Sequence, residues 1–200
     1  MSAAPRNLSP MTRAIFYTAS TLNGFLADPQ DSLDWLLTIP QDEATADIAA
    51  FSEGIGVLVE GSATYEWVRD HEDLMAHPER WQQFYGDRPT FVFTRREPEP
   101  VPGADIRFVQ GSVIEHWPDI VAAAAGKDVW IVGGGELVGQ FVDANLLDEI
   151  VITFAPATLA AGKPLLPRDL DHTQLELVGA RRAGPFAELT YRLPRAARGV

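Results

Sequence analysis

The segment Val129–Phe141, with the sequence VWIVGGGELVGQF, decides the fold more than any other part of the chain. Four apolar residues predict a buried strand, three glycines follow, and a helix is expected after them. Such glycines let an anion approach the free backbone N–H groups at the helix start, which suits the pyrophosphate of a dinucleotide. A tight turn without a ligand explains them equally well. Because a standard Rossmann domain carries its glycine fingerprint on its first strand, whereas this one comes late, we do not expect that fold.

Short β-branched or aromatic runs recur along the rest of the chain and alternate with helix-like segments. This pattern favours an α/β fold with a mostly parallel central sheet flanked by helices. Near the end of the chain, apolar residues alternate with polar ones on both sides of Ala183–Phe186, which predicts a C-terminal antiparallel hairpin. The runs that we expect to form strands before the hairpin are 14–19, 55–60, 90–94, 106–109, 129–132 and 149–154.

Two of the intervening segments predict helices with specific features. In Asp42–Ser52, we expect Ile48 and Phe51 to point inward. Ser112–Glu115 has the form of a capping box that opens a second helix. An interior proline costs a helix about 3 kcal/mol, so either this helix accepts Pro118 or a new helix starts with Pro118 in its first turn.

Composition limits the classes of function. The 200 residues contain no cysteine, and 46% are hydrophobic, so we expect a leader at 1–11, one compact domain at 12–194 and a tail at 195–200. The net charge of -12 argues against nucleic acid or an anionic membrane as a partner. With no secretion signal, no cysteine and no apolar stretch of membrane-spanning length, we expect a cytoplasmic protein.

Several reaction classes lack their motifs. There is no G-x-S-x-G elbow, and Gly162-Lys163 lacks the earlier glycine of a P-loop, which excludes serine hydrolases and P-loop NTPases. The four histidines do not have zinc-ligand spacing. Asp28, Asp31 and Asp34 recur every third residue, whereas a calcium loop needs every second. We therefore expect no metal site.

Two further junctions follow predicted strands. Gly61 permits close approach of a ligand, and Ser62 and Thr64 add hydroxyl groups beside a helix N-terminus. For that segment alone, an ordinary helix capped by Ser62 or Thr64 is the better interpretation. Thr94-Arg95-Arg96 places two guanidinium groups beyond a strand's carboxyl end, where parallel sheets bind ligands. This indicates either a phosphate site or a surface cluster of ion pairs.

Together, the three junctions resemble one family, the dihydrofolate reductase-like fold, and in particular the C-terminal reductase domain of the bifunctional riboflavin-biosynthesis deaminase/reductase and its stand-alone relatives. Gly61–Glu66 is similar to the family's G-R-x-T-Y-E motif, and Gly133–Leu137 to its G-G-G/A element. The resemblance extends over residues 13–193. Its other motifs are Ser20–Asp28 with the following Leu33–Trp35, and Leu146–Ile150 with Pro156 and the loop Ala161–Pro167.

The resemblance implies a reductase that binds NADPH, transfers hydride to a small pteridine- or pyrimidine-like heterocycle, and forms a homodimer. The cofactor would supply the redox chemistry, and the protein would supply positioning and electrostatics. By the same resemblance, Ala19, Leu26 and Ala27 line the nicotinamide, and Thr94-Arg95-Arg96 meets the adenosine end. The residues implied to hold the pyrophosphate are Gly61, Ser62, Thr64, Gly133, Gly134, Gly135, Glu136, Leu137 and Val138.

The chain departs from the family pattern at two positions. Ser62 stands where the motif commonly has Arg, which leaves the preference for NADPH over NADH to the two arginines of the third junction, Arg95 and Arg96. Asn23 replaces an Asp of the opening motif and cannot act as a general acid. The candidates nearest to the position of the ring-binding carboxylate in a dihydrofolate reductase are Asp34 and Asp42, which we assign as catalytic candidates.

Two alternative functions remain open. One is the riboflavin-pathway 5-amino-6-(5-phosphoribosylamino)uracil reductase, whose substrate phosphate would need basic residues such as Lys163 and Arg168. The other is a nucleotide-binding protein without turnover, because the cofactor elements are recognisable whereas the acid is not. Oxidation of the cofactor with a panel of pterins and pyrimidines would separate them.

Overall fold

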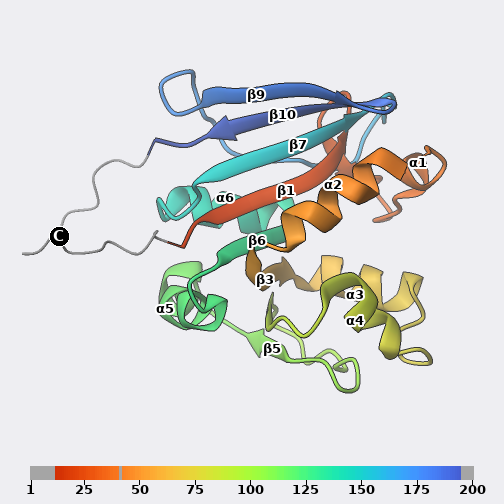
Figure 1. The fold of residues 1–200 in the computed structure, drawn as a ribbon, viewed down its shortest axis with the longest axis vertical. Helices are drawn as coiled ribbons and strands as arrows, with labels where there is room; N and C mark the ends of the chain where they lie inside the picture. Colours follow the sequence, from red (N-terminus) through yellow and green to blue (C-terminus); the bar gives the residue numbers. More distant parts are fainter. Residues whose placement is uncertain (1–11, 41, 195–200) are drawn as a thin grey trace, which may run out of the picture.

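The computed structural model describes residues 12–40 and 42–194, so the expected leader at 1–11 and tail at 195–200 lie outside the described residues. Figure 1 shows the sheet with helices on both of its faces. The strands are β1 (Ala14–Thr21), β2 (Phe25–Ala27), β3 (Ile55–Gly61), β4 (Thr90–Phe93), β5 (Ile106–Val109), β6 (Asp128–Gly133), β7 (Glu149–Ala155), β8 (Lys163–Pro164), β9 (Glu176–Ala183) and β10 (Phe186–Arg192).

The main sheet has the strand order β5-β4-β3-β6-β1-β7-β10-β9. Neighbouring strands from β5 to β7 are parallel. The strand β10 pairs antiparallel with both β7 and β9. The mostly parallel sheet with a C-terminal antiparallel hairpin is therefore confirmed. The short strands β2 and β8, which the sequence did not predict, form a separate two-stranded ribbon.

The helices of the described chain are α1 (Asp34–Leu37), α2 (Asp42–Ser52), α3 (Ser62–His71), α4 (Glu79–Tyr85), α5 (Val113–Ala124) and α6 (Gly135–Asp143). The largest apolar cluster joins α5 and α6 to one face of the sheet through residues such as Phe16 and Phe141. On the other face, Ile15 and Tyr17 pack against Phe51 of α2. Tyr65 of α3 and Trp81 of α4 pack there with Val92. Strands covered on both faces explain the nearly continuous apolar runs.

Only one of the two residues expected to point inward from α2 does so. The ring of Phe51 lies edge-on to Tyr17, with 4.9 Å between ring centroids. Ile48 is 40% exposed, so that expectation is wrong. The residue that shares the inner face with Phe51 is Asp47, four positions earlier, whose carboxylate pairs with Arg181 of β9 at 2.8 Å. Ile48 is thereby turned to the side of the helix.

The capping box at the start of α5 is confirmed. Ser112 Oγ accepts a hydrogen bond from the Glu115 N–H at 3.4 Å, and the Glu115 carboxylate accepts one from the Ser112 N–H at 3.2 Å. Pro118 lies inside this single helix, so the expectation of a fresh start at Pro118 is wrong. The cap and the burial of Val113 and Ile120 offset the backbone hydrogen bond that proline removes.

Candidate functional site

The pairing of β3 with β6 brings two helix N-termini together. The two strands are parallel neighbours, so α3 and α6 both begin at the same edge of the sheet. Gly61 is the N-cap of α3 and Gly134 is the N-cap of α6, and neither helix has a side-chain capping bond. A Cβ atom on Gly61 would lie 3.8 Å from the Gly134 nitrogen. The two starts therefore form one surface of backbone N–H groups, which suits an anion.

The same geometry settles how α3 begins. The helix starts at Ser62 with Gly61 in an extended conformation before it. The interpretation in which Ser62 or Thr64 caps this helix is therefore wrong, because both side chains lie within the helix rather than at its N-cap. Of the helices whose N-caps are described, only α5 has a side-chain capping bond, from its own Ser112; α1 and α4 lack one as α3 and α6 do, but only α3 and α6 have glycine at the N-cap.

The three glycines at the end of β6 have different surroundings. A Cβ on Gly133 would lie 3.1 Å from Thr64 Oγ1, at the base of α3. A Cβ on Gly135 would collide with the backbone of Pro164 and Leu165, so this glycine lets β8 pack onto α6. A Cβ on Gly134 would have no atom of the described residues within 4 Å. Only Gly134 thus opens the junction to a ligand.

The residues implied to line the nicotinamide lie close to this junction through β8. Ala27 of β2 pairs with Lys163 of β8, and the Leu165 N–H donates to the Gly24 carbonyl at 2.9 Å. Leu26 packs against the main core. Ala19 lies on β1, opposite Thr153 of β7. Contacts of β8 with both β2 and Gly135 place Leu26 and Ala27 beside the start of α6.

The first turn of α6 supplies backbone rather than side chains. Leu137 and Val138 are buried in the core. The exposed Glu136 carboxylate pairs with Arg168 at 2.9 Å, which lowers the pKa of Glu136 through a side-chain hydrogen bond. Glu136 and Leu137 can therefore offer a pyrophosphate only their backbone N–H groups, and the Val138 N–H is already donated to the Gly134 carbonyl at 3.1 Å.

The third junction borders a cavity of about 410 Å³ at the carboxyl ends of β4 and β5. Arg96 Nη2 donates to Ser62 Oγ at 3.1 Å and to Glu66 Oε2 at 2.9 Å. The guanidinium of Arg96 thus lies at the start of α3, where Ser62 replaces the arginine that the family motif commonly has. Its ion pair with Glu66 also fits the alternative interpretation, a surface cluster of ion pairs. The lining residues are Ser62, Phe93, Thr94, Arg95, Arg96, Val109, Gln110, Gly111 and Gln140.

The candidate acids are not brought to this surface by any contact that we find. Asp34 is exposed and is the first residue of α1, where its N–H donates to Ser32 Oγ at 3.0 Å. The side chain of Asp42 lies outside the described residues. The amide of Asn23 donates to the Leu159 carbonyl at 2.7 Å and accepts from the Leu159 N–H at 3.2 Å. Asn23 therefore has a structural role, because it holds the loop after β7 against the end of β1.

A carboxyl group that sequence reasoning missed is buried at the end of β3. Glu60 is 1% exposed, and neither carboxyl oxygen has a hydrogen-bond partner among the described residues. Burial raises the pKa of Glu60 to about 8, so the group is protonated at neutral pH. Burial also raises the pKa of Tyr65 to about 12, and the nearby charge of Glu60 contributes. The sequence does not reveal the burial of Glu60, because a single Glu at the end of the apolar run 55–59 is also typical of a strand that ends in solvent.

A second missed group fastens α2 to the hairpin. Tyr17 Oη donates to Glu188 Oε2 at 2.8 Å, and Arg181 Nε donates to Glu188 Oε1 at 2.7 Å. Arg181 also reaches Asp47 of α2. The pKa of Tyr17 is raised well above its usual range, first by burial and then by its hydrogen bond to Glu188. No local signal in the sequence could have linked residues from four separate elements.

No helix in the ranges 12–40 and 42–194 is both long and apolar enough to cross a membrane. Across the same ranges, His, Asp and Glu side chains form no group of three or more that could hold a metal ion.

Comparison with known proteins places these features in a family. The model of a family described as the RibD C-terminal domain matches residues 14–187. A protein from Shewanella sp. PV-4, provisionally assigned to riboflavin biosynthesis, is 25% identical with a TM-score of 0.73, over 92% of this chain and 100% of that one.

Two other solved structures share the fold at lower identity. One is the diaminohydroxyphosphoribosylaminopyrimidine deaminase/5-amino-6-(5-phosphoribosylamino)uracil reductase of Thermotoga maritima, 14% identical with a TM-score of 0.66, over 92% of this chain and 57% of that one. The other is the dihydrofolate reductase of Enterococcus faecalis in complex with NADP(H), 17% identical with a TM-score of 0.57, over 92% of this chain and 98% of that one. The dihydrofolate reductase-like fold expected from the sequence is confirmed.

The buried Glu60 generates a prediction about stability and pH. Unfolded Glu loses its proton above its ordinary pKa of 4.5, whereas folded Glu60 keeps its proton up to about pH 8. The folded protein therefore loses stability relative to the unfolded chain as the pH rises through that window, by about 1.4 kcal/mol per pH unit. Glu60→Gln removes this ionisation, so the variant should gain stability over the wild type progressively from pH 5 to pH 8.

Urea denaturation of both proteins at pH 5, 6, 7 and 8 measures the difference. Glu149→Gln, at a partly exposed carboxyl paired with Arg13, is the control and should show no such trend. A difference between wild type and Glu60→Gln that stays constant with pH would show that Glu60 is ionised in the folded protein.

Proposed function

The chain belongs to the RibD C-terminal domain family, and we propose that it is an NADPH-dependent reductase that transfers hydride to a pteridine- or pyrimidine-like heterocycle. The observation that carries the proposal is the pair of uncapped helix starts at Gly61 and Gly134, with open space above Gly134. The family match and its structural neighbours support a reductase-like role. Action in the cytoplasm as a homodimer is part of the same proposal.

The residues of the junction fit a dinucleotide. Backbone N–H groups of Ser62 and of Gly135–Leu137 would hold the pyrophosphate, because the dipoles of α3 and α6 both point their positive ends there. Arg95 and Arg96 would meet the adenosine end beside the 410 Å³ cavity. The nicotinamide, which supplies the hydride when bound, would lie toward Ala19 and β2. A dihydrofolate reductase with this fold is known in complex with NADP(H), which supports the assignment.

The chain itself would then position the nicotinamide and exclude water from it. The ribbon β2–β8 is anchored by the Leu165–Gly24 hydrogen bond and the close packing of Gly135, so it forms a fixed cover beside the nicotinamide position. Reduction of a C=N or C=C bond needs a proton as well as the hydride. Asp34 and Asp42 stay our candidates for its source, and their assignment rests on the family resemblance alone.

The narrower hypothesis, 5-amino-6-(5-phosphoribosylamino)uracil reductase, is supported by the family and by the activity named for the Thermotoga protein. Such a substrate carries a phosphate, yet the two basic residues expected for it already have acidic partners. Lys163 Nζ lies 3.2 Å from Asp31, and Arg168 contacts both Glu136 and Asp143 at 2.9 Å. Because both would have to leave these partners to bind a ribosyl phosphate, we favour an unphosphorylated heterocycle as the substrate.

The decisive experiment follows NADPH oxidation by the purified protein with pterins, dihydropterins and pyrimidines, with and without a ribosyl phosphate. We expect NADPH consumption with at least one planar substrate, and reduced product in equal amount. Binding of NADPH without oxidation by any substrate would instead support a nucleotide-binding protein without turnover. Absence of NADPH binding at millimolar concentration would contradict both functions.

Gly134 should be the glycine whose side chain affects the cofactor most. Its φ of -96° and ψ of -176° suit any residue, and its Cβ direction is open. Gly134→Val should therefore fold normally and lower NADPH affinity by at least tenfold, about 1.4 kcal/mol, since the branched side chain occupies the pyrophosphate's place.

Calorimetric titration with NADPH and thermal melting separate the two effects. Gly135→Ala is the matched comparison, because its Cβ would collide with the backbone after β8 and should lower the melting temperature instead. An unchanged NADPH affinity in a folded Gly134→Val protein would return the glycines to the role of a simple turn.

The arginines at the third junction should determine the choice of coenzyme. Arg95→Ala/Arg96→Ala should weaken NADPH binding by about ten- to a hundredfold and leave NADH binding nearly unchanged, because a charge-assisted hydrogen bond to the 2′-phosphate contributes about 1.5 to 3 kcal/mol. Arg107→Ala is the control, since Arg107 is an exposed arginine paired with Asp105 and does not line the cavity. Equal losses for NADPH and NADH, measured by titration, would refute a role in recognising the 2′-phosphate.

A further inference from the structure

The helix α3 has two flanks that face different neighbours. On one flank, Glu66 pairs with Arg96, which follows β4. On the other flank, Thr64 lies against Gly133 at the end of β6. Because β3 lies between β4 and β6 in the sheet, these are opposite sides of the helix. Trp67 and His71 follow Thr64 by three and seven residues, so they share its flank and face away from Arg96.

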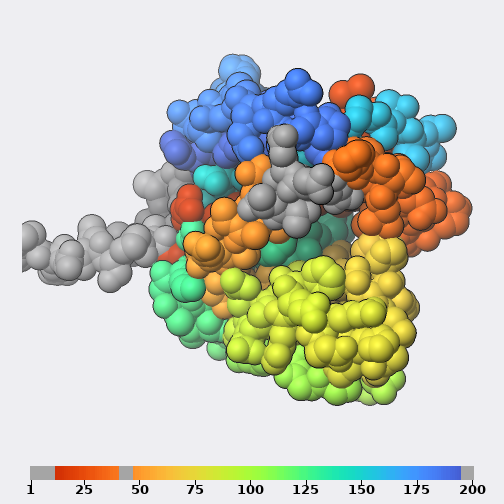
Figure 2. All heavy atoms as spheres, turned by 45° about the vertical axis from the view of Figure 1, so that its right-hand side comes forward, coloured from red at the N-terminus to blue at the C-terminus, as the bar shows by residue number. Residues whose placement is uncertain are grey.

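That flank borders a groove. Figure 2 shows the molecule hollowed between the orange segment that contains α1 and α2 and the yellow segment that contains α3 and α4, with teal atoms from the region of β6 and α6 at the bottom. The helix α2 covers β1 and β6 through Phe51, whose ring centroid lies 4.9 Å from that of Tyr17 and 5.5 Å from that of Trp130. The groove therefore runs between α2 and the Trp67–His71 flank of α3, over β6.

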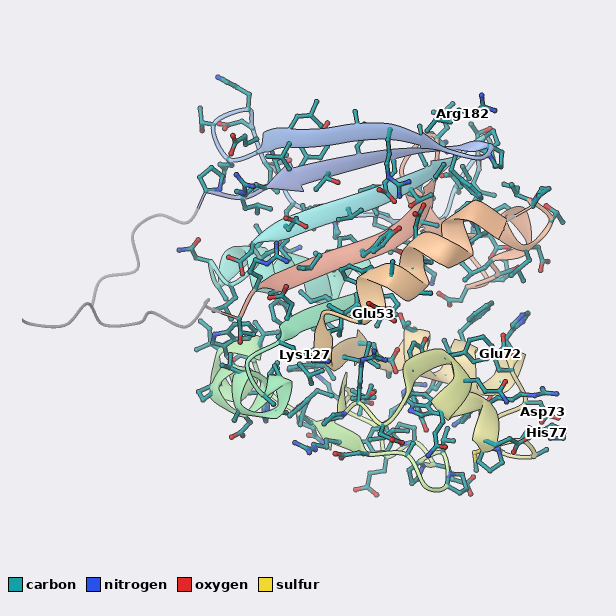
Figure 3. The ribbon with its side chains drawn as sticks, viewed as in Figure 1. Glu53, Glu72, Asp73, His77, Lys127 and Arg182 are labelled. Carbon is teal, nitrogen blue, oxygen red and sulfur yellow. The ribbon has the colours of Figure 1, made fainter. Side chains whose placement is uncertain are left out.

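The groove leads to the proposed cofactor junction. Its floor strand, β6, ends at Gly133, and the Thr64 end of the flank touches that glycine. In Figure 3, Glu72, the residue after His71, lies to the right of Glu53 and Lys127, which precede β3 and β6. The flank thus extends outward from the edge where the cofactor would bind, with His71 at its outer end.

Trp67 and His71 are stacked on each other. Their ring centroids are 4.4 Å apart, and the planes differ by 12°. His71 lies one helical turn beyond Trp67, so it covers the indole face that points toward the C-terminal end of α3. The opposite face of the indole is turned toward Thr64 and Gly133. His71 therefore supports one face of the Trp67 indole and leaves the opposite, flat face directed at the junction.

We propose that Trp67, held in place by His71, binds the heterocycle by stacking on its ring and selects flat rings as substrates. The inference rests on the proposed reductase function and names the substrate-recognising wall of that site. An indole is electron-rich and stacks with electron-poor rings such as pteridines and pyrimidinediones at separations like that of the Trp67–His71 pair. A ring in this place would lie against the indole face opposite His71, within the groove. A saturated or non-planar compound would lose this contact.

The test is equilibrium binding of heterocycles to the protein saturated with NADP+, which prevents turnover. The probes are pterin, lumazine and 5,6-diaminouracil, titrated by calorimetry. For the probe that binds most tightly, Trp67→Leu should weaken binding by about five- to tenfold, the effect of one stacked aromatic pair. Trp67→Phe should restore most of the affinity. NADPH affinity should change by less than about twofold in both variants.

The role of His71 has its own signature. His71→Ala should weaken probe binding by less than Trp67→Leu does, and His71→Phe should restore it, because a phenyl ring can also support the indole. Ile114→Ala, at an exposed residue of α5 on the opposite face of the sheet, is the matched control and should change nothing. Thermal melting of each variant shows that the fold is retained, and Trp67→Phe serves as the test where Trp67→Leu does not fold.

The outcomes distinguish this inference from the proposed function. Normal NADPH binding together with unchanged probe affinity in Trp67→Leu would overturn the stacking role and leave the reductase intact. Normal NADPH binding with no binding of any of the three probes to the wild type would overturn it as well. Loss of NADPH binding in the wild type would contradict the reductase itself.

Discussion

The parallel pairing of β3 with β6 is the constraint on which the rest of the structure depends. Because the two strands are hydrogen-bonded neighbours that run in the same direction, the helices that follow them begin at one edge, with Gly61 beside Gly134. A Cβ atom on Gly61 would be in ordinary contact with the Gly134 nitrogen, at 3.8 Å, so the two helix starts are direct neighbours. The pairing also determines which flank of α3 faces β6 and which faces β4, and so separates the Arg96 cavity from the groove beside α2. The ligand sites that we propose all follow from this one pairing.

Two buried carboxyl groups on the same face of the sheet show how differently a protein can accommodate a charge. Glu188 accepts hydrogen bonds from Tyr17 and Arg181, so its burial fastens α2 to the hairpin and fixes one wall of the groove. Glu60 has no such donors among the described residues and keeps its proton instead. The first arrangement stabilises a defined geometry, and the second lowers stability as the pH rises. Glu60 thus lowers stability at neutral pH although it lies beside a proposed ligand junction, and departures of this kind are expected at functional sites.

Much of the fold could be predicted from the sequence because its signals are local. The apolar runs, the glycines after Val132, the Ser112–Glu115 box and the turn at Ala183–Phe186 each act over a few residues, and each lies in the element expected. The ribbon β2–β8 could not be predicted, since strands of three and two residues have no periodicity and pair over long range. Which strands are neighbours is likewise a tertiary property.

In the candidate site, too, the features with local signals could be predicted and those that depend on tertiary contacts could not. The three junctions were found because glycine after a buried strand has a local physical reason. The groove was not, because Trp67 and His71 have the spacing of any helix face, and only the contacts of Thr64 and Glu66 show which side they occupy. Glu60 was missed for a similar reason: burial without a partner is decided by α3 and α4 above it. For the catalytic acid, the structure adds no contact that selects Asp34 over other exposed carboxyl groups.

A crystal structure of the protein grown with NADPH tests the central claim most directly. We expect the pyrophosphate between the starts of α3 and α6, over Gly134, with the adenosine end toward Arg95 and Arg96 and the nicotinamide toward Ala19. The dinucleotide bound at another place, or crystals grown in millimolar NADPH with an empty junction, would contradict the account.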